Sequence, residues 1–327
     1  GTSETRPELS PTDEFADFEF YDKLIELRPD APQKGTITNG DYVRGALKRG
    51  LEIENKIGVN PFKLGMIGAT DGHTGLASAE ENNFQGKFVG DSIPEQKENS
   101  SGRGLGWTAS TSGLAAVWAR ENTREEIIAA MKRREVYGTT GPRIAVRFFG
   151  GFDFAPGEEA AEDIAAVGYA KGVPMGGDIT AGGGKAPTFL VRAVKDPKDG
   201  NLDRIQIVKG WLGADGAAEE KVYDVAWAGD RAPGADGKLA PVGNSVDVAN
   251  ASYTNTIGAG ELSAMWTDPD FNADQKAFYY VRVLQIPTPR NSTYDSVALQ
   301  KPPPTSFPTS IQERAYSSPI WYSPAKG

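Results

Sequence analysis

The stretch Phe278-Tyr279-Tyr280-Val281-Arg282-Val283 consists mostly of aromatic and β-branched residues, which favour a β-strand. Five more stretches with a period of two precede it in the second half of the chain: 144–148, 189–193, 205–207, 222–227 and 262–266. Asp-Gly pairs, which are typical of tight turns, lie between or beside these stretches at 199–200, 215–216 and 236–237. Because no long helical pattern interrupts this half, the sequence predicts an antiparallel β-sandwich.

The first part of the chain shows helical patterns instead. Apolar residues recur at helical spacing over residues 12–25 and again over 41–58, where the second pattern ends at a glycine. A third helix begins after Thr123, which forms a capping box with Glu126. A short apolar strand over 64–67 separates the second helix from the third. This part of the chain is therefore predicted to mix α and β structure.

Changes of pattern divide the chain into three parts. The mixed α and β pattern ends near Gly141-Pro142, so we expect a first domain over residues 1–141, with a long polar, glycine- and serine-rich loop over 74–112. The β-sandwich follows over 142–285. The last part, 286–327, is rich in proline but also in aromatic residues, so we expect a tail that packs across the body and buries those rings.

The composition excludes several classes of function. The chain has 35 basic and 44 acidic residues, a net charge of −9, and no basic stretch, which argues against nucleic-acid binding. It has no cysteine, so disulfides, thiolate zinc sites and cysteine nucleophiles are excluded. It has one histidine, His73, so any site that needs an imidazole must use this residue. No run of about 18 apolar residues occurs, and a membrane-spanning helix is not expected.

The triplet Asp71-Gly72-His73 directly follows the apolar strand over 64–67. In an extended chain, residues two apart point to the same side, so the Asp71 carboxylate and the His73 imidazole can converge on one ion. Such a triplet is common by chance. The alternative is that Asp71 caps a turn while His73 is hydrogen-bonded at the surface of the domain.

Longer blocks around this triplet carry a resemblance to a known family. They are residues 60–73, 80–87, 133–144, 206–211 and 318–322. Together they resemble the bacterial family known as domain of unknown function 3604, over a region from about Asp13 to the C-terminus. That family is similar to a branch of the polymerase and histidinol phosphatase (PHP) superfamily of metal-dependent phosphoesterases.

The resemblance implies a fold and a metal site. The fold would be α/β plus all-β: the C-terminal part of a PHP-like distorted β/α barrel, then the antiparallel β-sandwich and the proline-rich tail. Asp71 and His73 would be ligands of a divalent metal, zinc or manganese. The superfamily's other ligands come from an H-x-H motif and further histidines that this sequence lacks, so an N-terminal segment of the same gene product is the expected partner. Gly72 departs from the family pattern, in which threonine or a similar residue is expected, and glycine loosens the loop between the ligands.

Five further residues are candidates for substrate binding. Glu81, Asn83 and Lys87 fall in the matched block that follows the metal motif. Arg103 lies in the glycine-rich loop and would belong to a lid, with a surface loop as the alternative. Arg143 would clamp an anionic substrate, with a salt bridge at the domain junction as the alternative. No single residue is identified as the catalytic acid, base or nucleophile.

These features predict a metal-dependent hydrolase of a phosphoester or related ester, with this chain supplying part of the metal site. The substrate would be a small molecule. The alternative is a non-catalytic fragment whose β-sandwich binds a ligand or a protein, with Trp211, Trp227 and Trp266 as an aromatic platform. The resemblance favours a periplasmic or secreted location, with the cytoplasm as the alternative.

Overall fold

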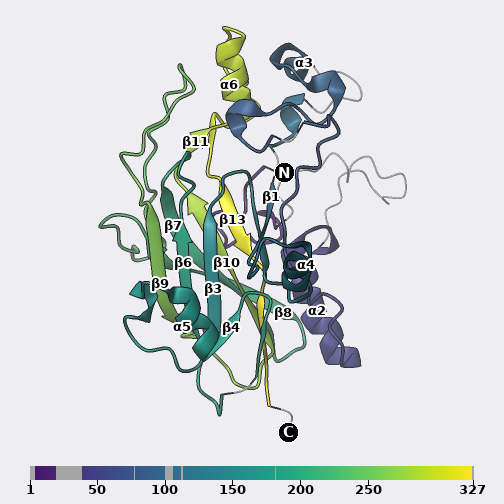
Figure 1. Cartoon of the computed structure of the whole chain (residues 1–327), viewed down its shortest axis with the longest axis vertical. Helices are drawn as coiled ribbons and strands as arrows, with labels where there is room; N and C mark the ends of the chain where they lie inside the picture. The colour runs from purple at the N-terminus through teal and green to yellow at the C-terminus, as the bar shows by residue number, and fades with distance from the viewer. Residues whose placement is uncertain are drawn as a thin grey trace.

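Strand β10 (Ala277–Gln285) forms the middle of the larger of two main sheets in the computed structural model, which describes residues 4–19, 39–76, 78–99, 106–111, 113–180 and 182–325 (Figure 1). Every residue of β10 is buried. One edge of β10 pairs with β7 (Leu202–Leu212) along its length. The other edge pairs with β13 (Arg314–Ser317) near one end and with β14 (Ile320–Ser323) near the other.

The larger sheet draws strands from all three predicted parts of the chain. Four further strands complete it: β8 (Ala218–Trp227) beside β7, β2 (Val136–Thr139) beside β13, β1 (Leu114–Val117) beside β2, and β5 (Asp178–Thr180) beside β14. These pairs are antiparallel except that of β14 with β5, which is parallel. The sheet therefore joins residues that lie 176 positions apart in the sequence, as in the pair of Ala315 with Thr139.

The smaller sheet is antiparallel, and its strand order is β4-β3-β6-β9. The strands are β3 (Ala145–Gly151), β4 (Gly172–Pro174), β6 (Thr188–Val194) and β9 (Glu261–Thr267). A separate pair, β11 (Thr288–Pro289) and β12 (Ser310–Ile311), lies outside both sheets. All six stretches with a period of two form strands, namely β3, β6, β7, β8, β9 and β10, so this prediction is confirmed.

The two sheets pack face to face around one apolar core. Phe189 of β6 and Tyr279 of β10 meet at its centre, with ring centroids 4.5 Å apart. Val191 of the smaller sheet and Val281 and Val283 of the larger sheet belong to the same buried cluster. Side chains that alternate along each strand fill the space between two sheets in this way in β-sandwiches. The sheet-rich, sandwich-like architecture is therefore as predicted.

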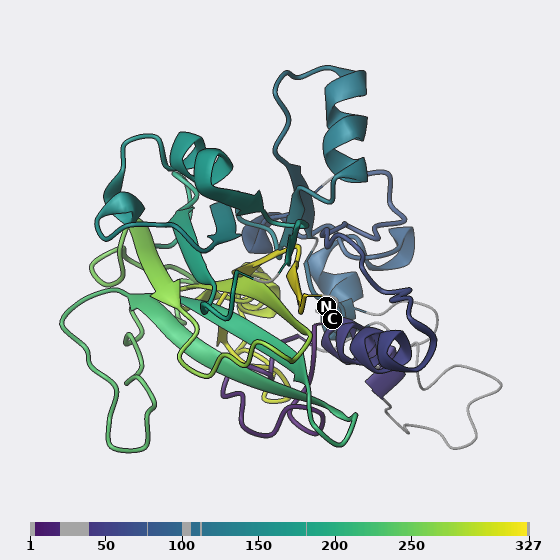
Figure 2. The ribbon, with the colours of Figure 1, turned by 90° about the horizontal axis from the view of Figure 1, so that it is seen from below.

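Five α-helices are described, and they cover the outer faces and ends of the sheets. They are α2 (Val43–Ile57), α3 (Pro94–Glu98), α4 (Arg124–Lys132), α5 (Ile164–Lys171) and α6 (Asn291–Ala298). Helix α2 packs on the outer face of the larger sheet and α5 on that of the smaller sheet, so they lie on opposite sides of the sandwich (Figure 2). Within the described ranges, no helix has the length and apolar character needed to span a bilayer.

Two of the three predicted helices are confirmed. Helix α2 ends at Gly58, whose φ of 78° lies in the left-handed region that glycine adopts without strain. Helix α4 begins after Thr123, whose hydroxyl accepts a hydrogen bond from the Glu126 backbone amide. The helix predicted over 12–25 is not present in its described part, because residues 12–19 form turns and bends; the rest of it lies outside the described residues.

The prediction of a PHP-like β/α barrel is wrong. The described residues form mostly antiparallel sheets with few helices, and these sheets do not close into a barrel. The predicted strand over 64–67 belongs to an extended segment (residues 62–71) that is part of neither sheet. Two backbone hydrogen bonds attach this segment to the start of β1 and to the residue before it: Gly68 N donates to Leu114 O (3.2 Å), and Gly113 N donates to Ala69 O (3.0 Å). Helix and strand alternate only locally in the sequence, whereas β1 pairs with β2, and β2 pairs with β13 from the C-terminal part of the chain.

A buried network of charges fixes the N-terminal residues 4–19 to the outer face of β10. The Arg282 guanidinium, fully buried on β10, donates to Asp13 Oδ1 (2.6 Å) and to Glu4 Oε2 (3.2 Å). Arg44 of α2 donates to the same two carboxylates, at 2.8 Å and 2.5 Å. Burial would raise the pKa of Asp13, but the neighbouring Arg282 and Arg44 outweigh it and hold that pKa well below its usual range. Both carboxylates are therefore ionised partners of two arginines.

Replacing one carboxylate of this network will destabilise the fold. In D13N, Arg282 and Arg44 stay buried but lose a charged partner, so we expect the free energy of unfolding to fall by about 3 kcal/mol or more. Because the pKa of Asp13 is depressed, its stabilising effect is present above its ordinary pKa and is lost as pH falls below it. Urea denaturation at pH 7 and at pH 3 measures both effects: the variant should differ clearly from the wild type at pH 7 and less at pH 3.

The matched control is D270N. Asp270 also pairs with a basic residue, Lys221, but on the surface, where both side chains are about half exposed. Exposed pairs contribute about 0–1 kcal/mol, so this variant should unfold almost as the wild type does. Equal unfolding free energies for D13N and D270N would show that the buried network does not hold the N-terminal residues as described.

Candidate functional site

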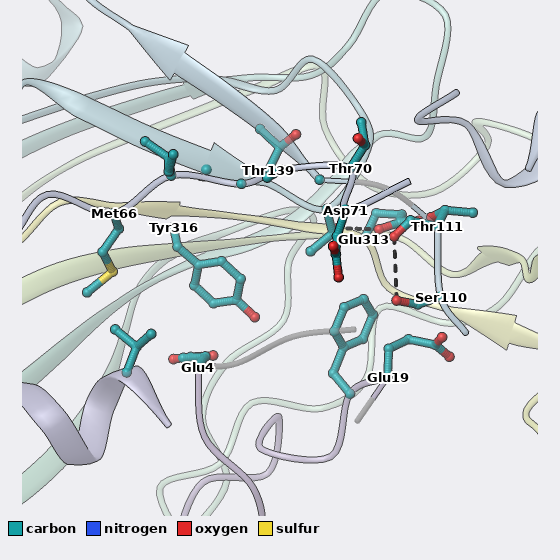
Figure 3. A pocket seen from close by; sticks show the side chains of 18 of the residues that line it. Glu4, Glu19, Met66, Thr70, Asp71, Ser110, Thr111, Thr139, Glu313 and Tyr316 are labelled. Carbon is teal, nitrogen blue, oxygen red and sulfur yellow. Dashed lines mark hydrogen bonds between the residues drawn. The ribbon is translucent and has the colours of Figure 1, made fainter. Parts of the chain in front are cut away.

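A pocket of about 530 Å³ lies beside helix α2, where β2 and β13 pair (Figure 3). One wall is apolar and consists of side chains from α2 and from the extended segment: Val43, Leu47, Leu64, Met66 and Ile67. The lining also includes four residues with hydroxyl groups, Ser110, Thr111, Thr139 and Thr140. The volume of the pocket falls within the range of small-molecule sites, about 300–1,000 Å³.

The charged residues that line the pocket are mostly acidic. They are Glu4, Glu19, Asp71, Glu81 and Glu313. Among the described residues that line the pocket, Lys87 is the one lysine or arginine. Two of these carboxylates form ion pairs with arginines that do not line the pocket. Glu4 pairs with Arg44 and Arg282 of the buried network, and Glu19 pairs with Arg290 at 2.7 Å.

Close backbone contacts fix the extended segment against the larger sheet. A Cβ atom on Gly138 of β2 would lie 2.5 Å from the backbone nitrogen of Gly68, so a glycine is required for this approach. The Met66 backbone amide donates to the hydroxyl of Ser318 (2.9 Å), which adds a second point of attachment. The segment ends at Asp71, whose φ of 47° is left-handed and turns the chain away from the sheet. The sheet thereby positions Asp71 at the edge of the pocket.

Asp71 and His73 converge as the sequence predicts. His73 Nε2 lies 3.5 Å from Asp71 Oδ1, and both side chains are more than half exposed. The imidazole stacks on Phe88, with ring centroids 4.9 Å apart, and the His73 backbone amide donates to Lys87 O (2.8 Å). The Lys87 ammonium donates a hydrogen bond to Asp71 Oδ2. One carboxylate thus faces an imidazole and an ammonium at the same time.

Lys87 also lowers the pKa of Asp71. Its hydrogen bond to the carboxylate is the largest influence on Asp71 and lowers the pKa of that group. Asp71 is therefore ionised over the whole physiological range, with its Oδ1 atom directed to His73. The Asp71 carboxylate is thus placed to bind a cation, and in this structure it forms an ion pair with the Lys87 ammonium group.

Glu81 and Glu313 lie deeper in the pocket wall. Glu81 accepts hydrogen bonds from the Thr111 hydroxyl (2.5 Å) and from the Asn291 backbone amide. Glu313, which is 3% exposed, accepts one from the Thr140 hydroxyl. Burial raises the pKa of both carboxyl groups; Glu19 adds to the effect at Glu81, and Glu81 adds to it at Glu313. The pKa of each of these two groups is thus shifted in the opposite direction to that of Asp71.

The other predicted substrate residues are not brought together. The side chain of Asn83 is exposed and accepts from Gln85 Nε2 (3.0 Å), and it does not line the pocket. Arg143 is 66% exposed, with Nη1 3.6 Å from Glu80 Oε1, and it is also absent from the lining. Arg103 lies outside the described residues. Of the predicted set, the pocket is lined by Asp71, Glu81 and Lys87.

Glu313 was missed by the sequence analysis, although a signal for it exists. Ile311, Glu313, Ala315 and Ser317 alternate with more polar or bulkier residues, and all four are buried. A period of two that includes a glutamate among small and apolar residues indicates a carboxyl group on the inner face of a strand. The prolines around this stretch led instead to the expectation of a wrapping tail.

The residues present fit a divalent metal only in part. An imidazole nitrogen and a carboxylate oxygen are donors that zinc and manganese use, and here they converge. In the part of the chain that the structure describes, however, no group of three histidine, cysteine, aspartate or glutamate residues has the geometry to hold a metal ion. A hydrolytic metal centre has at least three protein ligands and an open position for water. Asp71 and His73 alone would therefore bind such an ion weakly.

Comparison with known proteins identifies a family but no activity. A family model with the description "Protein of unknown function (DUF3604)" matches residues 1–324. No curated protein and no solved structure matches the chain. The match covers nearly the whole chain and confirms the resemblance noted for the sequence; it does not show membership of the PHP superfamily.

The raised pKa of Glu313 predicts a stability that depends on pH. The stability conferred by the protonated carboxyl group is present below its ordinary pKa of 4.5 and is lost as pH rises through the raised value. Within that window the wild type should lose up to about 1.4 kcal/mol per pH unit relative to E313Q, which cannot ionise. Thermal unfolding of both proteins at pH 5 and pH 8 should show a larger advantage of E313Q at pH 8.

Glu219 provides a control, because its side chain is exposed on β8 and does not line the pocket. E219Q should shift the unfolding temperature equally at both pH values. If the difference between E313Q and the wild type is the same at pH 5 and pH 8, then Glu313 is ionised in the folded protein and this account of its burial is wrong.

Proposed function

The chain belongs to the DUF3604 family, and we propose that it supplies the substrate pocket and part of a divalent-metal centre of an ester hydrolase. The observation that carries the proposal is the convergence of Asp71 Oδ1 and His73 Nε2, 3.5 Å apart, where Asp71 lines the pocket. The substrate is a phosphoester or a related ester. Bound zinc or manganese would polarise the ester and lower the pKa of a coordinated water molecule.

Further ligands have to come from outside the described residues. Since Asp71 and His73 provide two donors and hydrolytic centres use three or more, we propose that a further polypeptide segment of the same gene product completes the coordination. Both side chains are more than half exposed, which leaves their donor atoms accessible to an ion shared with such a segment. Within this chain, Phe88 orients the imidazole by stacking on it.

The pocket walls suggest how a substrate is held. The apolar wall from α2 and the extended segment would bind the hydrocarbon part of an ester, and burial of that part contributes about 25 cal/mol per Å². The hydroxyl groups of Thr139 and Thr140 would orient its polar part. Lys87 would hold Asp71 in place until an ion displaces its ammonium group. Each of these roles belongs to a residue that lines the pocket.

The second candidate function is a non-catalytic binding module. It is favoured by the lack, within the described ranges, of any group of three residues suited to hold a metal. The binding surface would then be the pocket itself. The proposed aromatic platform is a weaker candidate, because Trp211 and Trp266 are partly buried and pack against the core of the sandwich.

Metal titration separates the two candidates. Titration of the metal-free chain with Mn²⁺ and Zn²⁺ by calorimetry should show weak binding at one site for at least one of the two ions. D71N and H73Q should each weaken that binding about tenfold or more, since each removes one of two donors. D270N is the control, because Asp270 has a similar exposed pair with Lys221 but lies outside the pocket lining.

Two results would contradict the metal proposal. One is the lack of saturable binding at millimolar metal, which would leave the binding-module function. The other is binding that D71N and H73Q leave unchanged, which would place the ion elsewhere on this acidic chain.

Removing the ammonium group of Lys87 should strengthen metal binding. Lys87 donates to Asp71 Oδ2 and so competes with an ion for the carboxylate. In K87M we expect the metal affinity to rise by about tenfold, and the pKa of Asp71 to rise towards its usual range, because the largest cause of its depression is gone. Calorimetry measures the first effect, and carboxyl chemical shifts followed over a pH titration measure the second. A weaker metal affinity in K87M would mean that Lys87 positions Asp71 rather than competing for it.

A further inference from the structure

We propose that the ligand of the pocket carries a protonated amine, which pairs with Glu313 and Glu81, attached to an apolar body that lies against α2 and the extended segment. For the ester hydrolase this means an ester that bears a primary ammonium group. This inference deepens the proposed function and rests on the pocket being the substrate site.

The first argument is the unusual environment of Glu313. Its side chain is almost fully buried and lines the pocket (Figure 3). Its Oε2 atom accepts a hydrogen bond from Thr140, whereas no hydrogen bond to Oε1 is present among the described residues. Although the side chain as a whole is almost fully buried, Oε1 is not one of the enclosed side-chain atoms, and it opens on the pocket. The Oε1 atom is therefore available to a donor that enters the pocket.

The second argument is the contrast with other buried carboxylates. The remaining carboxylate side chains classed as buried are Glu4, Asp13, Asp91, Glu135, Asp196, Asp203, Asp268 and Asp295. Six of these pair with a lysine or an arginine at 3.2 Å or less. Asp91 and Asp196 each accept two backbone amide hydrogen bonds. Glu313 has neither form of compensation within the described part of the chain.

The third argument concerns the charge balance of the pocket. Three of its five acidic residues are already paired: Glu4 with Arg44, Glu19 with Arg290, and Asp71 with Lys87. For Glu81 and Glu313, no lysine or arginine nitrogen of the described residues lies within 4.0 Å. Neither carboxyl group therefore has a direct ion-pair partner among the described residues, and burial disfavours the ionised form of both. An ammonium group beside them would favour the ionised form. A cation that enters would be attracted to these two.

An organic ammonium group fits this environment better than a bare metal ion. Three hydrogen-bond donors match the open Oε1 of Glu313, the Glu81 carboxyl group and nearby threonine hydroxyls, and charge-assisted hydrogen bonds of this kind are strong. A metal ion would require a third protein ligand, which the described residues do not provide. The apolar wall with Leu47 and Met66 would remain empty around an ion but is filled by a hydrocarbon chain.

Binding of chemically matched probes tests the inference. The probes are n-octylammonium chloride, 1-octanol and sodium octanoate, measured by calorimetry at pH 7.5 on the full chain in EDTA. Octylammonium should bind at least about tenfold more tightly than octanol, and octanoate should bind more weakly than both. E313Q should abolish the preference for octylammonium over octanol while octanol binding persists. E81Q should reduce the preference, and E219Q should leave it unchanged.

The outcomes also separate this inference from the metal proposal. H73Q should keep the preference for octylammonium, because His73 does not line the pocket, although it weakens metal binding. Equal affinities of the wild type for octylammonium and octanol would overturn the inference and leave the metal site untouched. Failure of all three probes to bind would overturn the pocket as a small-molecule site. If octylammonium is preferred but metal binding is absent, the amine site stands and the hydrolase does not.

Discussion

The pairing of Arg282 with Asp13 and Glu4 is the interaction on which the site depends. Strand β10 alternates, so Tyr279, Val281 and Val283 face the core while Arg282 points to the opposite face. A guanidinium buried there requires carboxylate partners, and residues 4–19 provide them. Because the same N-terminal residues carry Glu4, Phe18 and Glu19 to the pocket, the arginine that completes the outer face of the sheet also fixes one wall of the site.

The strands could be predicted from the sequence, whereas their partners could not. A period of two is a local property, and it identified strands β3, β6, β7, β8, β9 and β10. The pairing of β2 with β13 joins Thr139 to Ala315, and no local pattern contains that information. The expected barrel failed for this reason: helices and strands alternate in the first part, but its strands are completed by the C-terminal part of the chain. The many prolines in that part argued against strands, so β13 and β14 of the larger sheet were not predicted.

In the candidate site, too, local patterns could be predicted from the sequence, whereas contacts between distant residues could not. Asp71 and His73 were predicted to converge because side chains two residues apart in an extended chain point to the same side. The structure places them 3.5 Å apart, but with Asp71 in a left-handed conformation rather than an extended one. Lys87 and Glu81 entered through a matched block of sequence, and both line the pocket. Arg143 does not line the pocket and lies 3.6 Å from Glu80, in keeping with the alternative of a salt bridge, because a position next to a predicted domain boundary does not determine the direction of a side chain. Glu313 contributes to the site only through tertiary structure, since it is distant in sequence from every other candidate residue.

The two kinds of carboxyl group in the pocket indicate different tasks. Asp71 is exposed, and Lys87 lowers its pKa further, which suits a carboxylate that exchanges one cation for another. Glu313 is buried with a raised pKa, and ionisation there costs folding stability. A glutamine of nearly the same shape would accept the hydrogen bond from Thr140 without that cost. A buried glutamate that lowers stability, at a position where glutamine would fit, is characteristic of residues that are retained for ligand binding rather than for folding. The energetic cost of Glu313 is therefore itself an argument that its charge meets a ligand.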